Sequence, residues 1–347
     1  MRFYEQHHQY YCGVDLHASS MYLCIQDDRG TILLHKNLPT SREAFQAAVQ
    51  PYCQDLAVAV ECMFSWYWIA DLCSQLNIAF VLGHALYMKA IHGGKTKNDK
   101  IDSKKIASLL RAKMLPVAYP YPQATRSTRD LLRRRMYFMH HQAELLSHIQ
   151  NTNTQYNLQG FCKRIDRQSN RVGLAEHFPD PMVRKSIEAD VKFLDVYHAI
   201  LLQLEQQVLE QARHHDPVLL GLLRTVPGIG KILALVMIYE IHDIRRFPKV
   251  GDFISYCRLV KPARESAGKK QGSKNSKIGN VHLKWAFSEA ACLFLRGNPP
   301  AKEVHQRLVS KYGKAKALSI IAQKLGRTVY SMLKHRQPFD PEKFFQS

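Results

Sequence analysis

Four acidic residues in the first third of the chain are the clearest candidates for chemistry: Asp15, Glu61, Asp99 and Asp102. Asp99 and Asp102 are the only acids in segment 86–113, which carries eight Lys or Arg residues. A solvated surface normally mixes both signs of charge, so an isolated acidic pair among lysines indicates a metal site ringed by phosphate contacts. The alternative is a helix start with Asp99 or Asp102 as its N-cap. The lysines expected to contact nucleic acid here are Lys95, Lys97, Lys100, Lys104 and Lys105.

The elements around these acids predict an α/β domain. β-Branched and aromatic residues predict antiparallel strands at 10–17, 20–27 and 31–35, a buried strand at 56–60 and another at 78–82, with a helix at 63–75. Asp15 then lies on a central strand, where a buried carboxylate needs a partner such as a divalent cation. Glu61 follows a strand end, where ligands of α/β sheets gather. Its alternative role is a carboxylate at a helix N-terminus, stabilised by the dipole.

Together these segments predict a ribonuclease H-like (RuvC-like) domain over residues 1–120, with Asp15, Glu61, Asp99 and Asp102 as metal ligands and catalytic groups. Phosphoryl transfer with two metal ions needs such a cluster, because the carboxylates bridge ions that flank the scissile phosphate. The expected cofactor is Mg²⁺, with Mn²⁺ as the alternative.

The middle of the chain, residues 121–215, is expected to form a long helical coiled-coil arm. A proline-punctuated segment at 119–123 ends the first domain. Helices are predicted at 127–151 and 182–213, and the second has apolar residues at spacings of three and four. An antiparallel arm that also helps subunits assemble is favoured over a helical bundle belonging to the core. Five arginines between 126 and 135 are expected either to touch nucleic acid or to form a solvated helix end.

The last part, residues 216–347, is expected to be a mainly α-helical domain with two phosphate-binding elements. The first is VPGIGK at 226–231, in which Gly228, Gly230 and Lys231 would present N–H groups at a helix N-terminus, although an ordinary Pro-Gly turn also fits. The second is a basic stretch at 245–285 with eleven Lys or Arg residues and two acids, whose centre at 266–279 is expected to be a loop. Its predicted nucleic-acid contacts are Arg258, Arg264, Lys269, Lys270, Lys274 and Lys277. Composition alone leaves Ser266, Ser273 and Ser276 equivalent as chemical groups.

Composition points to a polyanionic partner. The 347 residues include 49 Lys plus Arg and 29 Asp plus Glu, a formal charge of +20, which favours salt-dependent binding to nucleic acid. Purely structural RNA-binding proteins share this trait, so charge indicates the partner and not the activity. The sequence shows neither an 18-residue apolar run nor a signal-peptide pattern, so a cytoplasmic, nucleoid-associated location without membrane contact is expected. The eight cysteines form no C-x-x-C pair and are expected to be reduced and buried.

Several motifs resemble the insertion-sequence-110 transposases. GVDLH at 13–17, VAVE at 58–61 and GGKTKNDKIDSKKIA at 93–107 resemble that family's four-acid N-terminal domain, while segments 225–241 and 256–291 resemble its C-terminal domain. The resemblance spans nearly the whole chain in the same order. The chain departs beside the acids: Cys62, Met63 and Phe64 stand where many members have a small Thr-Gly segment, and Gly83-His84 stands in place of Asn-Pro.

The resemblance implies a serine nucleophile in the C-terminal domain, and the Arg-Glu-Ser-Ala-Gly segment at 264–268 assigns it to Ser266. It further implies a DNA recombinase that forms a phosphoserine link, a structured guide RNA encoded by the element, and a dimer or tetramer with composite active sites. Retention of bond energy in the ester fits the lack of an ATP-binding P-loop motif. The alternatives are a metal nuclease or junction resolvase that uses water, and a non-enzymatic nucleic-acid-binding protein.

Overall fold

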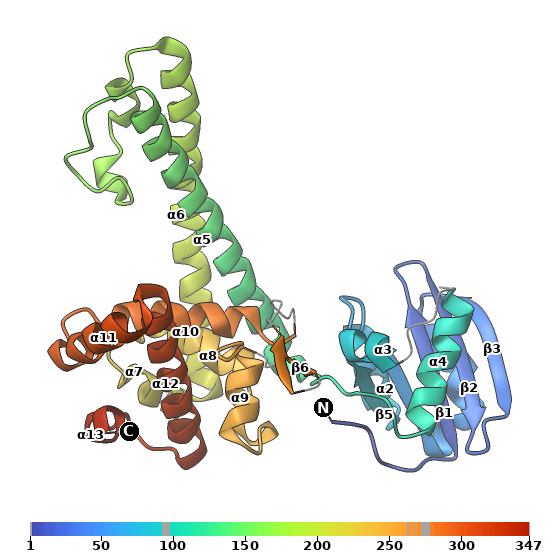
Figure 1. Ribbon diagram of the computed structural model, residues 1–347. Helices are drawn as coiled ribbons and strands as arrows, with labels where there is room; N and C mark the ends of the chain where they lie inside the picture. The colour runs from blue at the N-terminus through green and yellow to red at the C-terminus, as the bar shows by residue number, and fades with distance from the viewer. Residues whose placement is uncertain (1, 92–97, 262–263, 267, 272–277, 347) are drawn as a thin grey trace. The chain divides into compact units, whose positions relative to one another are not determined.

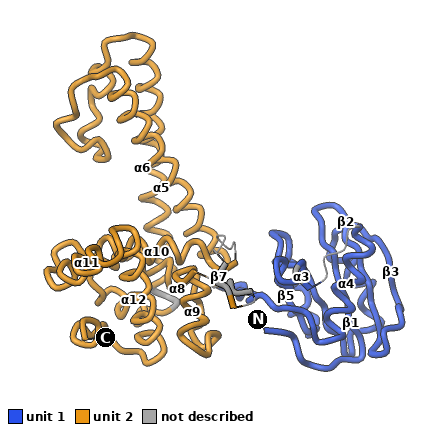
Figure 2. Tube along the Cα trace, in the orientation of Figure 1, with its two compact units in different colours: residues 1–124 blue, residues 125–347 orange. Residues whose placement is uncertain are grey.

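The computed structural model describes residues 2–91, 98–261, 264–266, 268–271 and 278–346 (Figure 1). The chain divides into two compact units, Met1–Ala124 (unit 1) and Thr125–Ser347 (unit 2), coloured separately in Figure 2. The division into domains 1–120, 121–215 and 216–347 stays a prediction.

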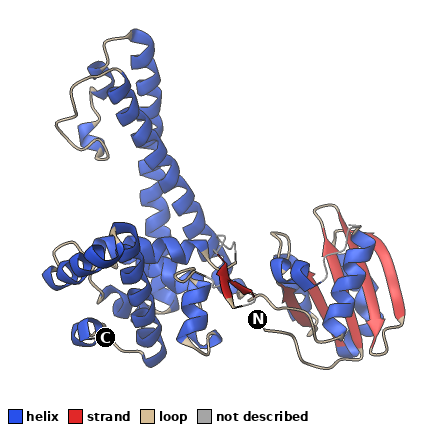
Figure 3. Ribbon diagram, in the orientation of Figure 1, coloured by secondary structure: helices blue, strands red, loops and turns tan. Residues whose placement is uncertain are grey.

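Unit 1 contains a mixed five-stranded sheet in the order β3-β2-β1-β4-β5 (Figure 3). Its strands are β1 (Tyr10–Leu16), β2 (Ser20–Asp27), β3 (Ile32–Pro39), β4 (Leu56–Glu61) and β5 (Ala79–Gly83). β1, β2 and β3 pair antiparallel, whereas β1, β4 and β5 run parallel. The early antiparallel piece and the later buried strands are therefore as predicted.

Helices cover both faces of this sheet. They are α1 (Arg42–Val49), α2 (Tyr67–Gln75), α3 (Ala85–Ile91) and α4 (Asp99–Arg111), with a 3₁₀ segment at Gln50–Asp55. Alternate side chains of β1 point to opposite faces: Cys12, Val14 and Leu16 share a core with α1 and α2, and Tyr11 shares one with α4. The helix predicted at 63–75 begins only at Tyr67, because residues 62–66 form a loop.

In unit 2, α5 (Gln123–Gln155) and α6 (Pro181–His215) lie side by side as an antiparallel pair (Figure 1). Arg135 near the start of α5 pairs with Glu205 near the end of α6, whereas His148 pairs with Asp190 at the other end. The two long helices were predicted, with ends a few residues farther out than expected. Coiled-coil packing and a role in assembly stay predictions.

The rest of unit 2 is a helical bundle. Its helices are α7 (Pro217–Arg224), α8 (Lys231–Ile241), α9 (Val250–Tyr256), α10 (Val281–Phe294), α11 (Pro299–Tyr312), α12 (Lys314–His335) and α13 (Pro341–Gln346). Short 3₁₀ turns are Gln168–Asn170, Leu174–His177 and Ile244–Arg246. α8 is buried from Leu233 to Ile241 and forms the centre of the largest core with α10 and α12.

The expectation of a loop over 266–279 is wrong for its first residues. β6 (Arg264–Ser266) and β7 (Lys269–Gln271) pair antiparallel, with Ser266 opposite Lys269. Gly268 has a φ of 73°, a left-handed conformation that glycine adopts without strain and that tight hairpin turns require. Gly268, one of the glycines that predicted a loop, thus lies in the tight turn between β6 and β7. Residues 272–277, with Ser273, Lys274, Ser276 and Lys277, lie outside the described residues.

Within the described ranges, no helix combines the length and apolarity needed to span a membrane. The eight cysteines are free thiols, but the expectation that they are buried holds for only four: Cys12, Cys24, Cys73 and Cys257. Cys53 is half-buried, while Cys62, Cys162 and Cys292 are exposed. Cys62 and Cys162 lie in bends between elements, and Cys292 lies on an exposed position of α10, so an apolar neighbourhood in sequence did not place them in a core.

Candidate active site

Asp15 and Glu61 stand next to each other at the carboxyl ends of parallel strands. The β1–β4 register pairs Val14 with Val60, the residues just before the two acids. Side chains alternate along a strand, and Tyr11 and Ala59 both pack on the α4 face. Asp15 and Glu61, even numbers of residues farther on, therefore face the same side of the sheet. The predicted convergence of these strand ends is present.

α4 approaches this face unusually closely because residue 13 is glycine. A Cβ at Gly13 would lie 2.2 Å from the carbonyl oxygen of Ser103 and 2.3 Å from the backbone nitrogen of Ala107. Only glycine allows this backbone-to-backbone packing. It brings the first turn of α4, with Asp99 and Asp102, to the end of β1.

The alternative interpretation of this pair is right about the helix start and wrong about the cap: Asp99 and Asp102 lie in the first turn of α4, but neither is its N-cap. Asn98 has the extended backbone of an N-cap, and its side chain accepts a hydrogen bond from the Lys100 N–H at 2.9 Å. Because Asn98 satisfies the helix start, the carboxylates of Asp99 and Asp102 remain available in its first turn. Asp102 lies 3.3 Å from the Lys105 ammonium.

His17 joins Asp15 and Asp99 in one cluster, which does not include Glu61 or Asp102, and His17 was not among the predicted site residues. Its Nε2 lies 3.4 Å from Asp15 and 3.6 Å from Asp99. One ligand atom from each of these three residues lies within 4.8 Å of the others, a spacing suited to a shared cation. The signal was present in the sequence, since Asp15 and His17 are two residues apart in the strand predicted at 10–17 and would share a face there.

The charge balance of the cluster favours a cation. Burial raises the pKa of Asp15, and the neighbouring charges of Asp99 and Asp102 raise it further, whereas His17 opposes the rise. A raised carboxyl pKa means that the ionised form lacks sufficient compensation from the protein itself. Two carboxylates and an imidazole within coordination distance of one point fit a divalent metal ion; the imidazole suits Mn²⁺ better than Mg²⁺, which prefers oxygen ligands.

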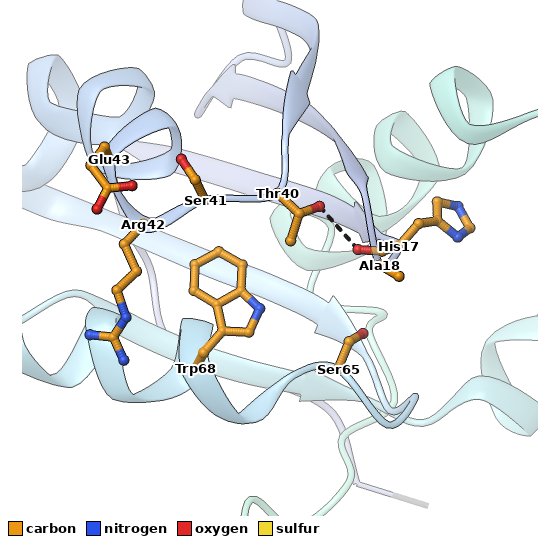
Figure 4. Close-up of a pocket in the computed structure, with 8 residues that line it drawn as sticks. All are labelled: His17, Ala18, Thr40, Ser41, Arg42, Glu43, Ser65 and Trp68. Carbon is orange, nitrogen blue, oxygen red and sulfur yellow. Dashed lines mark hydrogen bonds between the residues drawn. The ribbon is translucent and has the colours of Figure 1, made fainter.

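A pocket of about 510 Å³ opens beside His17 (Figure 4). The Thr40 hydroxyl closes one wall by donating a 3.0 Å hydrogen bond to the His17 carbonyl. The lining residues are His17, Ala18, Thr40, Ser41, Arg42, Glu43, Ser65 and Trp68.

The structure describes three of the five lysines near α4 that were predicted to contact nucleic acid. Lys100 and Lys104 are exposed on α4 and Lys105 is half-buried beside Asp102, whereas Lys95 and Lys97 lie outside the described residues. Their contact with nucleic acid stays a prediction.

The VPGIGK segment joins α7 and α8. Gly228 has a φ of 85°, and a Cβ there would lie 2.5 Å from the Phe294 backbone nitrogen, so its first function is close packing on α10. Gly230 is the exposed N-cap of α8 with open space around it, and Lys231 is exposed at the first helical position. The helix start at Gly230 and Lys231 is thus the part available to a phosphate.

Within the basic stretch, hydrogen bonds join the residues that precede the β6–β7 hairpin to those that precede α10. The Asn280 N–H donates to the Tyr256 carbonyl at 2.6 Å, and the Arg258 Nε donates to the Gly279 carbonyl at 3.0 Å. Arg258, predicted to contact nucleic acid, therefore helps close this loop. The hairpin β6–β7 and residues Arg264, Ser266, Lys269 and Lys270 lie between these two groups of residues.

A buried carboxylate on α8 links α5 to Asn280, the residue that precedes α10. Glu240 of α8, 3 % exposed, accepts hydrogen bonds from Arg129 and Arg133 of α5 and from Asn280, the N-cap of α10. Burial alone would raise the pKa of Glu240, but the hydrogen bond from Arg133 and the charges of both arginines bring it to about 2. Arg129 and Arg133, members of the cluster expected at a nucleic-acid surface or a solvated helix end, instead hold α5 to the bundle.

Comparisons with known proteins match both halves of the chain. A transposase family defined by the Asp-Glu-Asp-Asp domain of IS110 elements matches residues 12–158, and the Transposase IS116/IS110/IS902 family matches residues 220–306. A search of curated proteins finds no match. The two families together cover about two thirds of the chain, and both are families of IS110 transposases. The chain belongs to the IS110 family of transposases, enzymes that process DNA by phosphoryl transfer and depend on a divalent metal ion.

Proposed function

We propose that this transposase cuts and rejoins DNA through a serine ester, with Ser266 as the nucleophile and Asp15, Glu61, Asp99 and Asp102 as the metal-binding groups. The observation that carries the proposal is the convergence of Asp15, His17 and Asp99 on one point at the end of β1. A divalent cation held there, Mg²⁺ or Mn²⁺, would polarise a DNA phosphate and offset its charge.

The acids, the lysines of α4 and His17 would each have a separate role at the proposed metal site. Asp15 and Glu61 are carried by strands, and Asp99 and Asp102 by a helix packed directly on β1, an arrangement that would limit the movement of the four proposed carboxylate ligands. Lys100, Lys104 and Lys105 offset phosphate charge beside them. His17 holds Asp15 and Asp99 in place and is a further ligand candidate.

In the strand-transfer step, the Ser266 hydroxyl gives up its proton and its oxygen forms a bond to phosphorus. The bond from phosphorus to a DNA sugar oxygen breaks, and that oxygen takes up a proton. The phosphoserine ester retains the bond energy, so attack by another DNA hydroxyl rejoins the strand and releases Ser266 without ATP. Arg264, Lys269, Lys270, Lys274 and Lys277 would grip the DNA around this serine, and Gly228, Gly230 and Lys231 would hold a phosphate at the start of α8.

Ser266 belongs to unit 2 and the acids to unit 1. We propose that subunits of a dimer or tetramer combine these parts, and that an RNA encoded by the element pairs with donor and target DNA. Both proposals rest on the family and not on the geometry of the site.

Trapping on DNA that contains the sequences flanking the gene tests the mechanism. The full-length protein is expected to form an adduct with radiolabelled DNA that survives denaturing detergent, and Ser266→Ala is expected to abolish both adduct and strand cleavage. Asp102→Ala should also abolish both, because it removes a metal ligand. If Ser266→Ala leaves cleavage intact while Asp102→Ala abolishes it, water is the nucleophile and the serine mechanism is wrong.

A further inference from the structure

The loop between β4 and α2, residues 62–66, carries two large apolar side chains in solvent. Phe64 is 82 % exposed and Met63 is 52 % exposed. Among phenylalanines in the described ranges, Phe64 is the most exposed. Leaving a Phe side chain in water forgoes about 1.5–3 kcal/mol of burial, so an exposed pair of this kind indicates a surface that another molecule covers.

This loop is held in place on both sides of Phe64. The Cys62 N–H donates to the Gly83 carbonyl at 2.9 Å, and the Met63 N–H donates to the Glu61 carbonyl at 2.8 Å. On the other side, Trp66 is buried and stacks on Phe80 with ring centroids 6.0 Å apart. Phe64 is therefore presented from a tip whose two ends are fixed, which lowers the entropy cost of binding.

The tip lies at the same edge of the sheet as the acids. It follows Glu61 directly, and the Ser65 hydroxyl donates a 3.4 Å hydrogen bond to the carbonyl of Leu16, which lies between Asp15 and His17. Ser65 also lines the pocket beside His17 (Figure 4). A DNA strand with a phosphate at the acids would bring its neighbouring bases past this tip.

We propose that Phe64 stacks on a DNA base next to the phosphate held by the acids, and that Met63 extends the apolar contact. Aromatic side chains stack on any base, and Phe and Met are among the residues that wedge between base steps and unstack them. The occupant is DNA because the chain acts on DNA and because α4 places exposed lysines around the same acids. The inference rests on the proposed role of the acids as the phosphate-binding centre.

The position of the contact is tested by photocrosslinking of the full-length protein. The probe is a 20-nucleotide thymidine oligomer with one central 5-iodouracil, which crosslinks to aromatic rings stacked on it. In Ca²⁺, the crosslink is expected on Phe64, located by mass spectrometry of the peptide that contains it. Phe64→Trp should retain the crosslink, Phe64→Ala should lose at least about nine tenths of it, and Met114→Ala should leave it unchanged. Met114 is a suitable control because it is 50 % exposed and follows the opposite end of α4.

Competition then tests whether the base itself is bound. Unlabelled thymidine oligomer should displace the probe better than an oligomer of the same length without bases, and Phe64→Ala should reduce this preference by about 5- to 150-fold, the effect of one stacked base. An unchanged preference, or a crosslink that never falls on residues 62–66, would overturn the proposal. A change of oligomeric state in Phe64→Ala with DNA binding unaltered would assign the tip to a protein contact instead.

Failure of the metal centre can be told apart from failure of this inference. Mn²⁺ binding by the double variant Asp15→Asn, Asp99→Asn is measured separately by electron paramagnetic resonance. If wild type and double variant bind Mn²⁺ alike, the acids are not the metal site, and a crosslink on Phe64 would still establish base stacking. If only wild type binds Mn²⁺ and neither crosslinks at Phe64, the stacking inference alone is wrong.

Discussion

Gly13→Ala tests whether the backbone contact between β1 and α4 sets the geometry of the acids. The new Cβ would lie 2.2 Å from the Ser103 carbonyl oxygen, whereas ordinary contact begins at 3.4 Å, so α4 has to withdraw by about 1 Å. Both close atoms belong to the α4 backbone, so no side-chain rotation can relieve the overlap. Asp99 and Asp102 would move with the helix, away from Asp15.

The magnitude follows from the tolerance of metal sites. Ligand distances in such sites hold to about ±0.2 Å, so a shift of about 1 Å breaks the arrangement. We expect Mn²⁺ affinity to fall about 10- to 100-fold, as for other changes that misplace metal ligands indirectly. Overpacking should also cost unit 1 about 1–3 kcal/mol of unfolding free energy.

The assay combines a Mn²⁺ titration by electron paramagnetic resonance with hydrogen exchange of unit 1. Gly251→Ala is the matched control, because a Cβ at that position of α9 meets nothing within 4 Å. It should bind Mn²⁺ like the wild type. A Gly13→Ala protein with unchanged Mn²⁺ affinity and unchanged exchange in α4 would refute the close packing of α4 on β1.

Three further predictions follow from the charges and caps. Asp15→Asn should raise the melting temperature of unit 1 in EDTA at pH 7 while abolishing DNA cleavage. The raised pKa of Asp15 means that its ionised carboxylate destabilises the fold above that pKa, so removing the charge stabilises unit 1. A lower melting temperature would contradict this sign. Glu240 has a folded-state pKa of about 2, below its usual 4.5, so its contribution is complete above about pH 4.5 and is lost as the pH falls through about 2. The loss amounts to about 3 kcal/mol in unit 2, and Glu240→Gln should remove this pH dependence from hydrogen exchange in α8 and α10; equal pH profiles for variant and wild type would argue against the network. Asn98→Ala should cost α4 about 1 kcal/mol and speed exchange in its first turn, with Asp28→Asn, in an exposed turn, as the unaffected control.

The sequence predicted the parts of the site that depend on local patterns. Runs of β-branched residues predicted the strands, and the strand predicted at 56–60 placed Glu61 at its carboxyl end, where β4 ends in the structure. Asp15 and Glu61 end neighbouring parallel strands and so share an edge, as expected, whereas Asp99 reaches Asp15 because α4 packs on Gly13. Whether Ser266 is the nucleophile stays a prediction.

What the sequence did not predict depends on distant contacts. Nothing local to Gly13 shows that the backbone of Ser103 lies against it, and nothing local to Arg133 shows that Glu240, 107 residues away, accepts its hydrogen bonds. The arginine cluster therefore resembled a nucleic-acid surface in sequence although two of its members hold a buried carboxylate. His17 is different, since its spacing of two residues from Asp15 is a local pattern that the sequence itself contains.

The most direct test of the central claim is an anomalous difference map from crystals of the full-length protein soaked in Mn²⁺. We expect a peak between Asp15, His17 and Asp99, within coordination distance of the two carboxylates, and its loss in Asp15→Asn. A map with no peak at the end of β1, or with the two carboxylates turned away from each other, would contradict it.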